Sequence, residues 1–176
     1  MIKILKQKNK GFTLVETLVA ISIFTMSVLA LMVILGQGVS DTGYAKKKMT
    51  ATYLAQEGIE YIRNIRDTSA LSSTLLSAGW SDFKNNLISS CSVSCYFDSE
   101  ISNSVISCGN NSCQHLFYNY GKYNYDSIGD DSGFVRSVRV DSVSEDEIKI
   151  NSTVFWTQGS GTYSVSFSES LFNWIQ

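Results

Sequence analysis

Side chains able to do nucleophilic or acid–base chemistry are few in this 176-residue chain. His115 is the single histidine, so no pair of imidazoles can bind a metal, and no imidazole stands near a recognisable nucleophile. Serines are abundant, but none lies in a nucleophile motif such as Gly-x-Ser-x-Gly. The net charge of -2 gives no sign of a general nucleic-acid binder. We therefore expect a protein that is not an enzyme and that uses no cofactor.

The four cysteines are Cys91, Cys95, Cys108 and Cys113, and they lie within 23 positions. Charged residues make up only 17% of the chain, a composition that suits an extracytoplasmic domain, where such a cluster forms disulfides. Three pairings are possible. The nested one, Cys91 with Cys113 and Cys95 with Cys108, would close a hairpin through residues 98–103, and we favour it slightly over pairing of neighbours. A four-cysteine zinc site is the alternative, but the spacings differ from the usual zinc knuckle.

Two further groups of side chains could bind a ligand. Asp126, Asp130 and Asp131 lie in a glycine-containing segment and form a weak calcium candidate, although their spacing is not that of an EF-hand and a solvated turn is expected. A tyrosine-rich segment follows the cysteines and could stack on sugars or bases. Cross-strand pairs in a sheet explain this segment more simply, without any ligand. Its tyrosines are Tyr118, Tyr120, Tyr123 and Tyr125.

The N-terminus combines a basic segment with a long apolar run. Residues 1–10 contain four lysines and no acidic residue. The apolar run, residues 17–36, has no charged side chain, and as a helix its 20 residues would span about 30 Å, the thickness of a bilayer core. The lysines before it favour a cytoplasmic N-terminus. Its hydroxyl side chains can bond back to the helix backbone; they include Ser22, Thr25 and Ser27.

Glu16 lies at the edge of this run, where an ionised carboxylate is costly and usually has a partner. The stretch Lys10–Glu16, KGFTLVE, followed directly by the apolar run, resembles the N-terminus of type IV pilins and type II secretion pseudopilins. The resemblance implies that a prepilin peptidase cuts after Gly11 and methylates the new N-terminus at Phe12. It also implies that Glu16, fifth in the mature chain, pairs with the terminal amine of a neighbouring subunit and sets its register.

The elements that must carry these residues follow from periodicity. Residues 44–67 predict an amphipathic helix with apolar side chains at three- and four-residue steps: Ala51, Leu54, Ala55, Ile59, Ile62 and Ile65. Gly36, Gly38 and Gly43 precede this helix and either loosen it or mark a break. Residues 134–141, 147–156 and 163–167 alternate apolar and polar, which predicts an antiparallel meander, with a further strand within residues 117–125.

The sequence thus predicts an α+β fold, in which a long N-terminal helix packs on a C-terminal antiparallel sheet. The expected parts are a basic leader at 1–11, a transmembrane and assembly helix at 12–43, and an extracytoplasmic pilin-like domain at 44–176. That domain would contain the stem helix 44–67, a disulfide region at 91–113 and a sheet at 114–176. Its last strands are similar to minor pilin C-terminal regions at Phe134 with Arg136, Val154–Trp156 and Leu171–Trp174.

The resemblance implies a minor pilin or pseudopilin, a structural subunit of a type IV pilus or a type II secretion-like filament. Its partners would be a prepilin peptidase, other pilins or pseudopilins, an inner-membrane assembly platform and the membrane; nucleic acid would enter only in a competence role. The precursor would cross the inner membrane once and then join a periplasmic or cell-surface filament. The alternatives are an adhesin or DNA-binding pilin, or a membrane-anchored extracytoplasmic protein that enters no filament.

Overall fold

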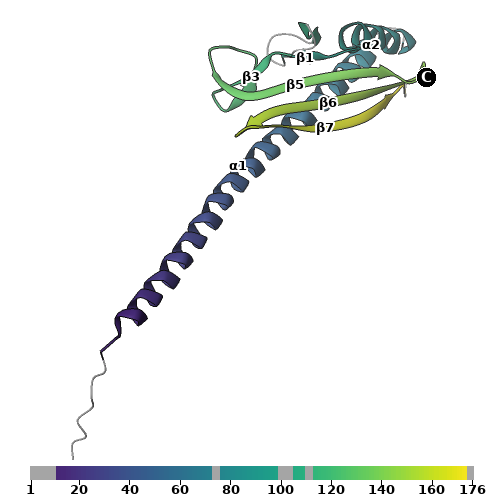
Figure 1. Ribbon diagram of the computed structural model, residues 1–176. Coiled ribbons are helices and arrows are strands. Elements are labelled where there is room, and N and C mark those ends of the chain that lie inside the picture. Colours follow the sequence, from purple (N-terminus) through teal and green to yellow (C-terminus); the bar gives the residue numbers. More distant parts are fainter. Residues whose placement is uncertain (1–10, 73–75, 99–104, 110–112, 174–176) are drawn as a thin grey trace, which may run out of the picture. The chain divides into compact units, whose positions relative to one another are not determined.

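The protein is α+β, as the sequence predicts (Figure 1). The computed structural model describes residues 11–72, 76–98, 105–109 and 113–173, so the basic segment 1–10 and Trp174 lie outside the described residues. A long helix is followed by a shorter helix and a seven-stranded antiparallel sheet. The elements are α1 (Leu14–Ser72), α2 (Leu76–Cys91), β1 (Cys95–Phe97), β2 (Val105–Ser107), β3 (His115–Asn119), β4 (Lys122–Asn124), β5 (Asp130–Ser142), β6 (Glu147–Gln158) and β7 (Gly161–Phe172).

Helix α1 continues without interruption through Gly36, Gly38 and Gly43. These glycines therefore do not interrupt the helix, although Gly43 ends the first of two compact units. Each glycine weakens a helix by about 1 kcal/mol relative to alanine, but long flanking runs of good helix formers outweigh that cost. The helix also extends beyond the predicted end of the stem, to Ser72. The chain divides into two compact units between Gly43 and Tyr44.

Strand β5 is the centre of the sheet. One side of β5 pairs with β6 from Phe134 to Ser142, and its other side pairs with β3 and β1. Strand β6 pairs with β7 in unbroken register over the full length of both strands. The three predicted strands at 134–141, 147–156 and 163–167 are confirmed, each within a longer observed strand.

The predicted strand within 117–125 is instead a hairpin formed by β3 and β4. Tyr120 and Gly121 connect the two strands, with φ values of 47° and 84°. Positive φ at both central residues is the mark of a type I′ turn, whose twist matches that of the flanking strands. Tyr118 and Tyr123 face each other across this hairpin, with ring centroids 5.1 Å apart.

The stem part of α1, from Tyr44 onward, packs on one face of the sheet. The side chains that it buries are Ala51, Leu54, Ala55, Ile59 and Ile62, the face that the periodicity predicts. Alternate residues of β5 and β6 meet this face, among them Val138, Val140, Ile148, Ile150 and Val154. Burial of one such aliphatic side chain contributes about 1.5–3 kcal/mol, so this contact is the main source of stability in the domain.

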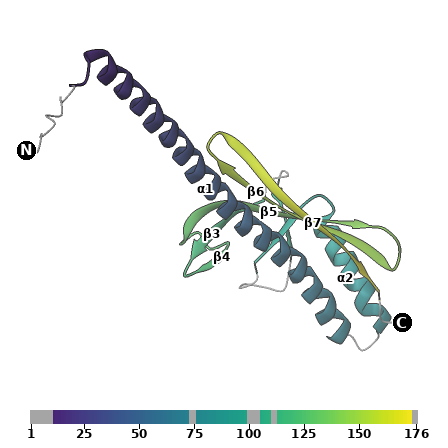
Figure 2. The same cartoon turned by 90° about the horizontal axis from the view of Figure 1, so that it is seen from below.

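Helix α2, which the sequence analysis did not predict, covers the end of the same core (Figure 2). Its buried residues Trp80, Phe83 and Leu87 contact the cluster around Ile62. The indole Nε1 of Trp80 donates a hydrogen bond to the carbonyl oxygen of Glu145 at 2.9 Å. This bond ties α2 to the turn between β5 and β6.

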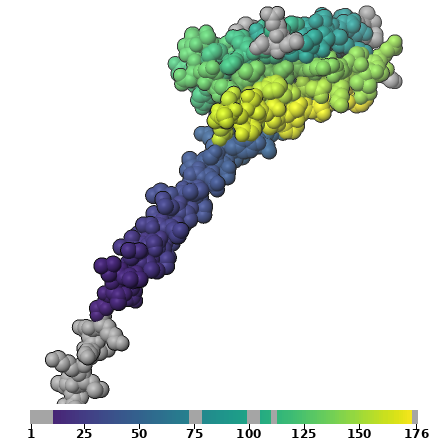
Figure 3. All heavy atoms as spheres, viewed as in Figure 1, coloured from purple at the N-terminus to yellow at the C-terminus, as the bar shows by residue number. Residues whose placement is uncertain are grey.

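The opposite face of the sheet is mostly polar, although Phe155 on β6 is 40% exposed there. On β7, which forms an edge of the domain in Figure 3, serines alternate with half-buried residues. The hydroxyl groups of Thr153 and Ser166 lie 2.8 Å apart and form a hydrogen bond between β6 and β7. The alternation follows from the pleat, which sends successive side chains to opposite faces.

Candidate processing and assembly site

The bond between Gly11 and Phe12 lies just before the first turn of α1. Gly11 has no neighbouring atom within 4 Å of the position that a Cβ would take, and Phe12 is 79% exposed. Neither residue takes part in regular secondary structure. The candidate scissile bond is therefore accessible and outside regular secondary structure within the described part of the chain, as a protease groove requires.

Thr13 caps the start of α1. Its Oγ1 accepts a hydrogen bond from the backbone N–H of Glu16 at 3.3 Å, and its carbonyl oxygen accepts one from Thr17 N at 3.2 Å. This is the usual N-cap arrangement, and Thr-x-x-Glu is the spacing of a capping box. The Glu16 carboxylate thus lies in the first turn, where the positive end of the helix dipole favours it.

The Glu16 side chain has no hydrogen bond or ion pair with any described residue. The N-cap uses only the backbone N–H of Glu16, so both carboxylate oxygens of Glu16 remain exposed. The assembly role of Glu16 stays a prediction, because its expected partner belongs to another subunit.

The first part of α1 is long and apolar enough to cross a membrane. None of its apolar side chains is buried within the chain, so another environment must cover them. The hydroxyl groups bond back to the helix as predicted: Ser22 to Val19 O at 2.8 Å, Thr25 to Ser22 O at 2.9 Å and Ser27 to Ile23 O at 2.8 Å. Bonds of this kind remove the cost of a polar group in lipid.

The predicted disulfides are present, but the nested pairing is wrong. Cys91 is bonded to Cys95, and Cys108 to Cys113, with Cα–Cα distances of 4.8 and 4.7 Å. Strands β1 and β2 do form the expected hairpin, whose connecting residues 99–104 lie outside the described residues. Its register places Ser107, not Cys108, opposite Cys95. Cys108 is one residue further on, and a one-residue step turns a side chain to the other face.

The three candidate calcium ligands do not converge. Among the described residues no group of three or more histidine, cysteine, aspartate or glutamate side chains could hold a metal ion. Asp126 accepts a hydrogen bond from Ile128 N at 3.1 Å, and Asp131 accepts one from Gly133 N at 2.8 Å. The amide of Gly133, together with His115, lowers the pKa of Asp131. These carboxylates stabilise local turns.

The tyrosine-rich segment is used mostly within the sheet. Tyr125 is buried beside Tyr96, with ring centroids 4.8 Å apart, and Tyr123 contacts Phe134. The Tyr118–Tyr123 pair across β3 and β4 confirms the cross-strand interpretation for these two residues. Tyr120 is 98% exposed because it occupies the tip of the turn.

An ion pair between the buried Arg136 and the exposed Glu57, which was not predicted from the sequence, connects the stem helix to the sheet. Arg136 on β5 is 2% exposed, and its Nη1 donates to Glu57 Oε2 on α1 at 2.7 Å. The guanidinium also lies 4.1 Å from the ring centroid of Phe97 and 5.9 Å from that of Tyr125. Burial raises the pKa of Tyr125, and the nearby guanidinium opposes the rise.

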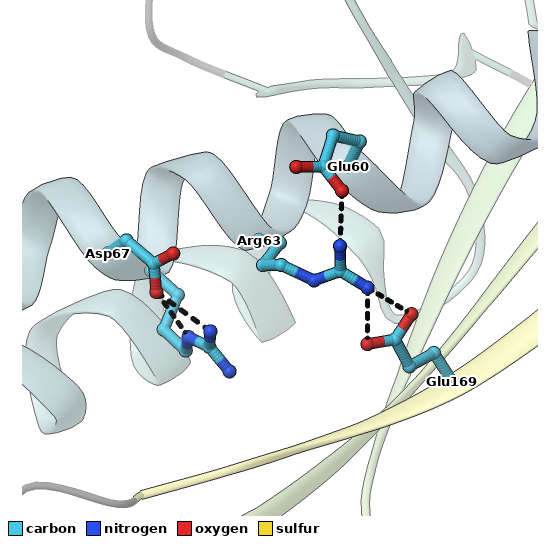
Figure 4. A network of polar contacts seen from close by, with 5 residues as sticks. Glu60, Arg63, Asp67 and Glu169 are labelled. Atoms are coloured by element: carbon cyan, nitrogen blue, oxygen red, sulfur yellow. Dashed lines mark hydrogen bonds and ion pairs between the residues drawn. The ribbon is translucent and has the colours of Figure 1, made fainter.

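A second polar network joins α1 to the edge strand β7 (Figure 4). Arg63 Nη2 donates to both carboxylate oxygens of Glu169 at 2.7 Å, and Nη1 donates to Glu60. The Glu60–Arg63 pair is the helix-surface pair that their spacing predicts. The Glu169 carboxylate raises the pKa of Arg63. One turn further on, Arg66 pairs with Asp67 at 2.7 Å.

Residues 6–34 match the family model of the prokaryotic N-terminal methylation motif, the prepilin-type signal of type IV pilins and pseudopilins. The match includes the candidate cleavage site and most of the apolar run, and it ends before the domain that begins at Tyr44. No curated protein and no solved structure gives a significant match to the chain. The motif, the apolar helix and the α+β layout define a type IV pilin-like precursor, and the same features fit membrane anchoring.

Proposed function

We propose that this protein is a minor pilin or pseudopilin, a non-enzymatic subunit of a type IV pilus or a type II secretion-like filament. The observation that carries the proposal is the methylation motif at residues 6–34, which continues into an apolar helix with none of its side chains buried in the chain. A filament of such subunits would bury these helices against each other once they leave the membrane.

In this proposal a prepilin peptidase cuts after Gly11 and methylates the amine of Phe12. The exposed bond before α1, outside regular secondary structure, supports the first step. Methylation keeps the positive charge of the new amine. The exposed Glu16 carboxylate of one subunit then pairs with the amine of its neighbour in the filament core, where low dielectric strengthens their attraction and fixes the register.

The proposed partners follow from this route. The precursor crosses the inner membrane once, meets the peptidase on the cytoplasmic side and is built into a filament by an inner-membrane platform, beside other pilins or pseudopilins. The mature subunit then lies in the periplasm or at the cell surface. The two disulfides support an oxidising final compartment.

The decisive measurement is the N-terminal mass of the protein from cells with and without a prepilin peptidase. We expect a chain that starts at N-methylated Phe12 in the first strain and an intact leader in the second. Gly11→Val should block cleavage, because its branched side chain obstructs the bond; Gly38→Val is the control beyond the site. An intact Met1 in cells with an active peptidase that processes its other substrates would overturn the proposal.

The role of Glu16 needs a separate experiment. Glu16→Ala should still be cleaved but should enter filaments much less often, because the terminal amine of the neighbour then has no partner in the filament core. Ser22→Ala is the control in the same helix. Equal amounts of Glu16→Ala and unaltered subunits in sheared filament fractions would rule out a role in registration.

A further inference from the structure

Three consecutive lysines, Lys46, Lys47 and Lys48, stand at the start of the domain. They follow the apolar run by ten residues, which is about 15 Å of helix. Lys46 and Lys48 are exposed. The Nζ of Lys47 donates a hydrogen bond to the carbonyl oxygen of Thr157 at 2.9 Å, which places the lysines beside the turn between β6 and β7.

Aromatic rings hold this end of the domain in place. The ring of Tyr44 lies 5.1 Å from that of Tyr163 and 6.1 Å from that of Trp156. Lys48 Nζ lies 5.9 Å from the centroid of Tyr44, within the range of a cation–π contact. Tyr163 remains 39% exposed, so a partly accessible tyrosine stands next to the lysines. We call Tyr44, Lys46, Lys47, Lys48 and Tyr163 the lysine patch.

The charge of the lysine patch is not neutralised within the described residues. Neither Lys46 nor Lys48 forms an ion pair there, and the segment 157–163 contains no acidic side chain. Residues 44–176 as a whole carry 10 basic and 14 acidic side chains, a net charge of -4. The lysine patch therefore gives the start of an acidic domain a positive charge, with Lys46 and Lys48 on different sides of α1, and it complements an anionic partner.

We propose that the lysine patch binds the anionic headgroups of the membrane that holds the apolar run of α1. This inference rests on the proposed membrane-anchored precursor. A headgroup layer extends about 5–8 Å beyond the hydrocarbon core, and the Debye length at physiological salt is about 8 Å. Lysines that follow the apolar run by about 15 Å of helix are thus within reach of the surface potential, and their side chains are long enough to extend towards it.

The directions of the lysines favour a headgroup layer over a protein partner. Successive residues on a helix point about 100° apart, so Lys46 and Lys48 leave α1 about 200° apart, on nearly opposite sides. A single protein surface meets one side of a helix. A layer that surrounds the helix meets both lysines, and tyrosines are enriched at the same depth.

The test uses the full chain in vesicles of phosphatidylcholine, with and without about 30% phosphatidylglycerol. Flotation first establishes that the chain is inserted. Lysines are then acetylated with an uncharged ester and mapped by mass spectrometry. In the anionic vesicles Lys46 and Lys48 should react at least about threefold more slowly, and about 0.5 M salt should abolish the difference. The exposed Lys149 on β6 is the internal control and should not change.

Two variants test the contact between the lysine patch and the headgroups at the turn between β6 and β7. Hydrogen exchange of residues 157–163 should slow in the anionic vesicles for the unaltered chain and for Lys149→Gln, but not for Lys46→Gln/Lys48→Gln. Equal acetylation rates of Lys46 and Lys48 in both kinds of vesicle would rule out headgroup binding by the lysine patch. That result would not affect the proposed membrane anchor. If protection of Lys46 and Lys48 from acetylation rises with protein density in phosphatidylcholine alone, the partner is a second copy of the chain. That result would also rule out headgroup binding. A chain that fails to float would contradict the membrane anchor of the proposed function instead.

Discussion

Gly58 lies at a close approach of α1 to β6 of the sheet. A Cβ at this position would lie 2.3 Å from Ser152 Oγ and 3.2 Å from Ser152 Cβ. Ser152 is fully buried on β6, and its hydroxyl has no hydrogen-bond partner among the described residues. The glycine thus serves close packing, although alanine is the better helix former.

Gly58→Ala should lower the free energy of unfolding by about 1–3 kcal/mol, because overpacking outweighs a gain of about 1 kcal/mol in helix propensity. Urea unfolding of the oxidised domain measures this change. Ser152→Gly removes both close atoms, so the double variant should be less destabilised than the sum of the single variants. Strict additivity would show that the two residues do not clash.

Arg136 and Glu57 share an ion pair but differ in burial. The Arg136 side chain is 3% exposed and that of Glu57 is 43% exposed. Loss of Glu57 would leave a charge buried without a partner, whereas loss of Arg136 would leave a carboxylate that water can still reach. The two halves of the pair therefore contribute unequally to stability.

Glu57→Ala should destabilise the domain by about 2–4 kcal/mol, and adding Arg136→Met should recover much of that loss, because methionine fills the site without a charge. Urea midpoints of the two single variants and the double variant give the comparison. A double variant less stable than Glu57→Ala would mean that the contacts of Arg136 with Phe97 and Tyr125 matter more than its charge.

At the scale of elements, the two disulfides brace short segments. The Cys91–Cys95 bond joins the end of α2 to the start of β1, and Cys108–Cys113 connects the segment after β2 to the segment before β3. Each closes a loop of only a few residues, for which the chain-entropy model gives about 2 kcal/mol. Their effect is to position the β1–β2 hairpin on β5.

Glutamate-specific digestion without reduction distinguishes the pairings, because Glu100 lies between the two cysteine pairs. The local bonds should yield two separate peptides, each with an internal disulfide. The nested pairing would hold both peptides together until reduction. Recovery of one linked species as the main product, under conditions that block thiol exchange, would contradict the local pairing.

At the scale of the whole molecule, the two compact units differ in the burial of their side chains. Every described side chain that is buried lies between Ala51 and Leu171, within the unit Tyr44–Gln176, and both disulfides lie there too. The apolar run before it buries nothing within the chain. No described side chain before Tyr44 is buried in the core of the second unit.

A fragment of residues 44–176 should be soluble without detergent and should unfold in one cooperative transition, because it keeps the whole described core. Near-ultraviolet circular dichroism and thermal melting of the oxidised fragment test this. Its melting temperature should match that of the domain in the full chain in detergent. A fragment without fixed aromatic signals would show that the first unit contributes to folding.

The sequence by itself determined the features whose information is local. The order Gly11, Phe12 and Glu16 before an apolar run indicates the prepilin-type signal. Recognition by a peptidase and insertion into a membrane both depend on contiguous residues. The apolar steps from Ala51 to Ile65 and the alternation in β5, β6 and β7 predicted which faces would be buried. Periodicity carries this information, since backbone geometry sets the repeat.

Only the tertiary structure decided what depends on register and distant contacts. The buried residues Trp80, Phe83 and Leu87 of α2 recur at helical spacing, but the position of this helix is set by its packing against the cluster around Ile62. The pairing of Cys95 followed from the register that puts Ser107 opposite it, and the partner of Arg136 followed from the position of α1 over β5. These pairings depend on the free energy of the assembled core. That free energy comes from contacts between residues far apart in the sequence, so no short segment predicts them.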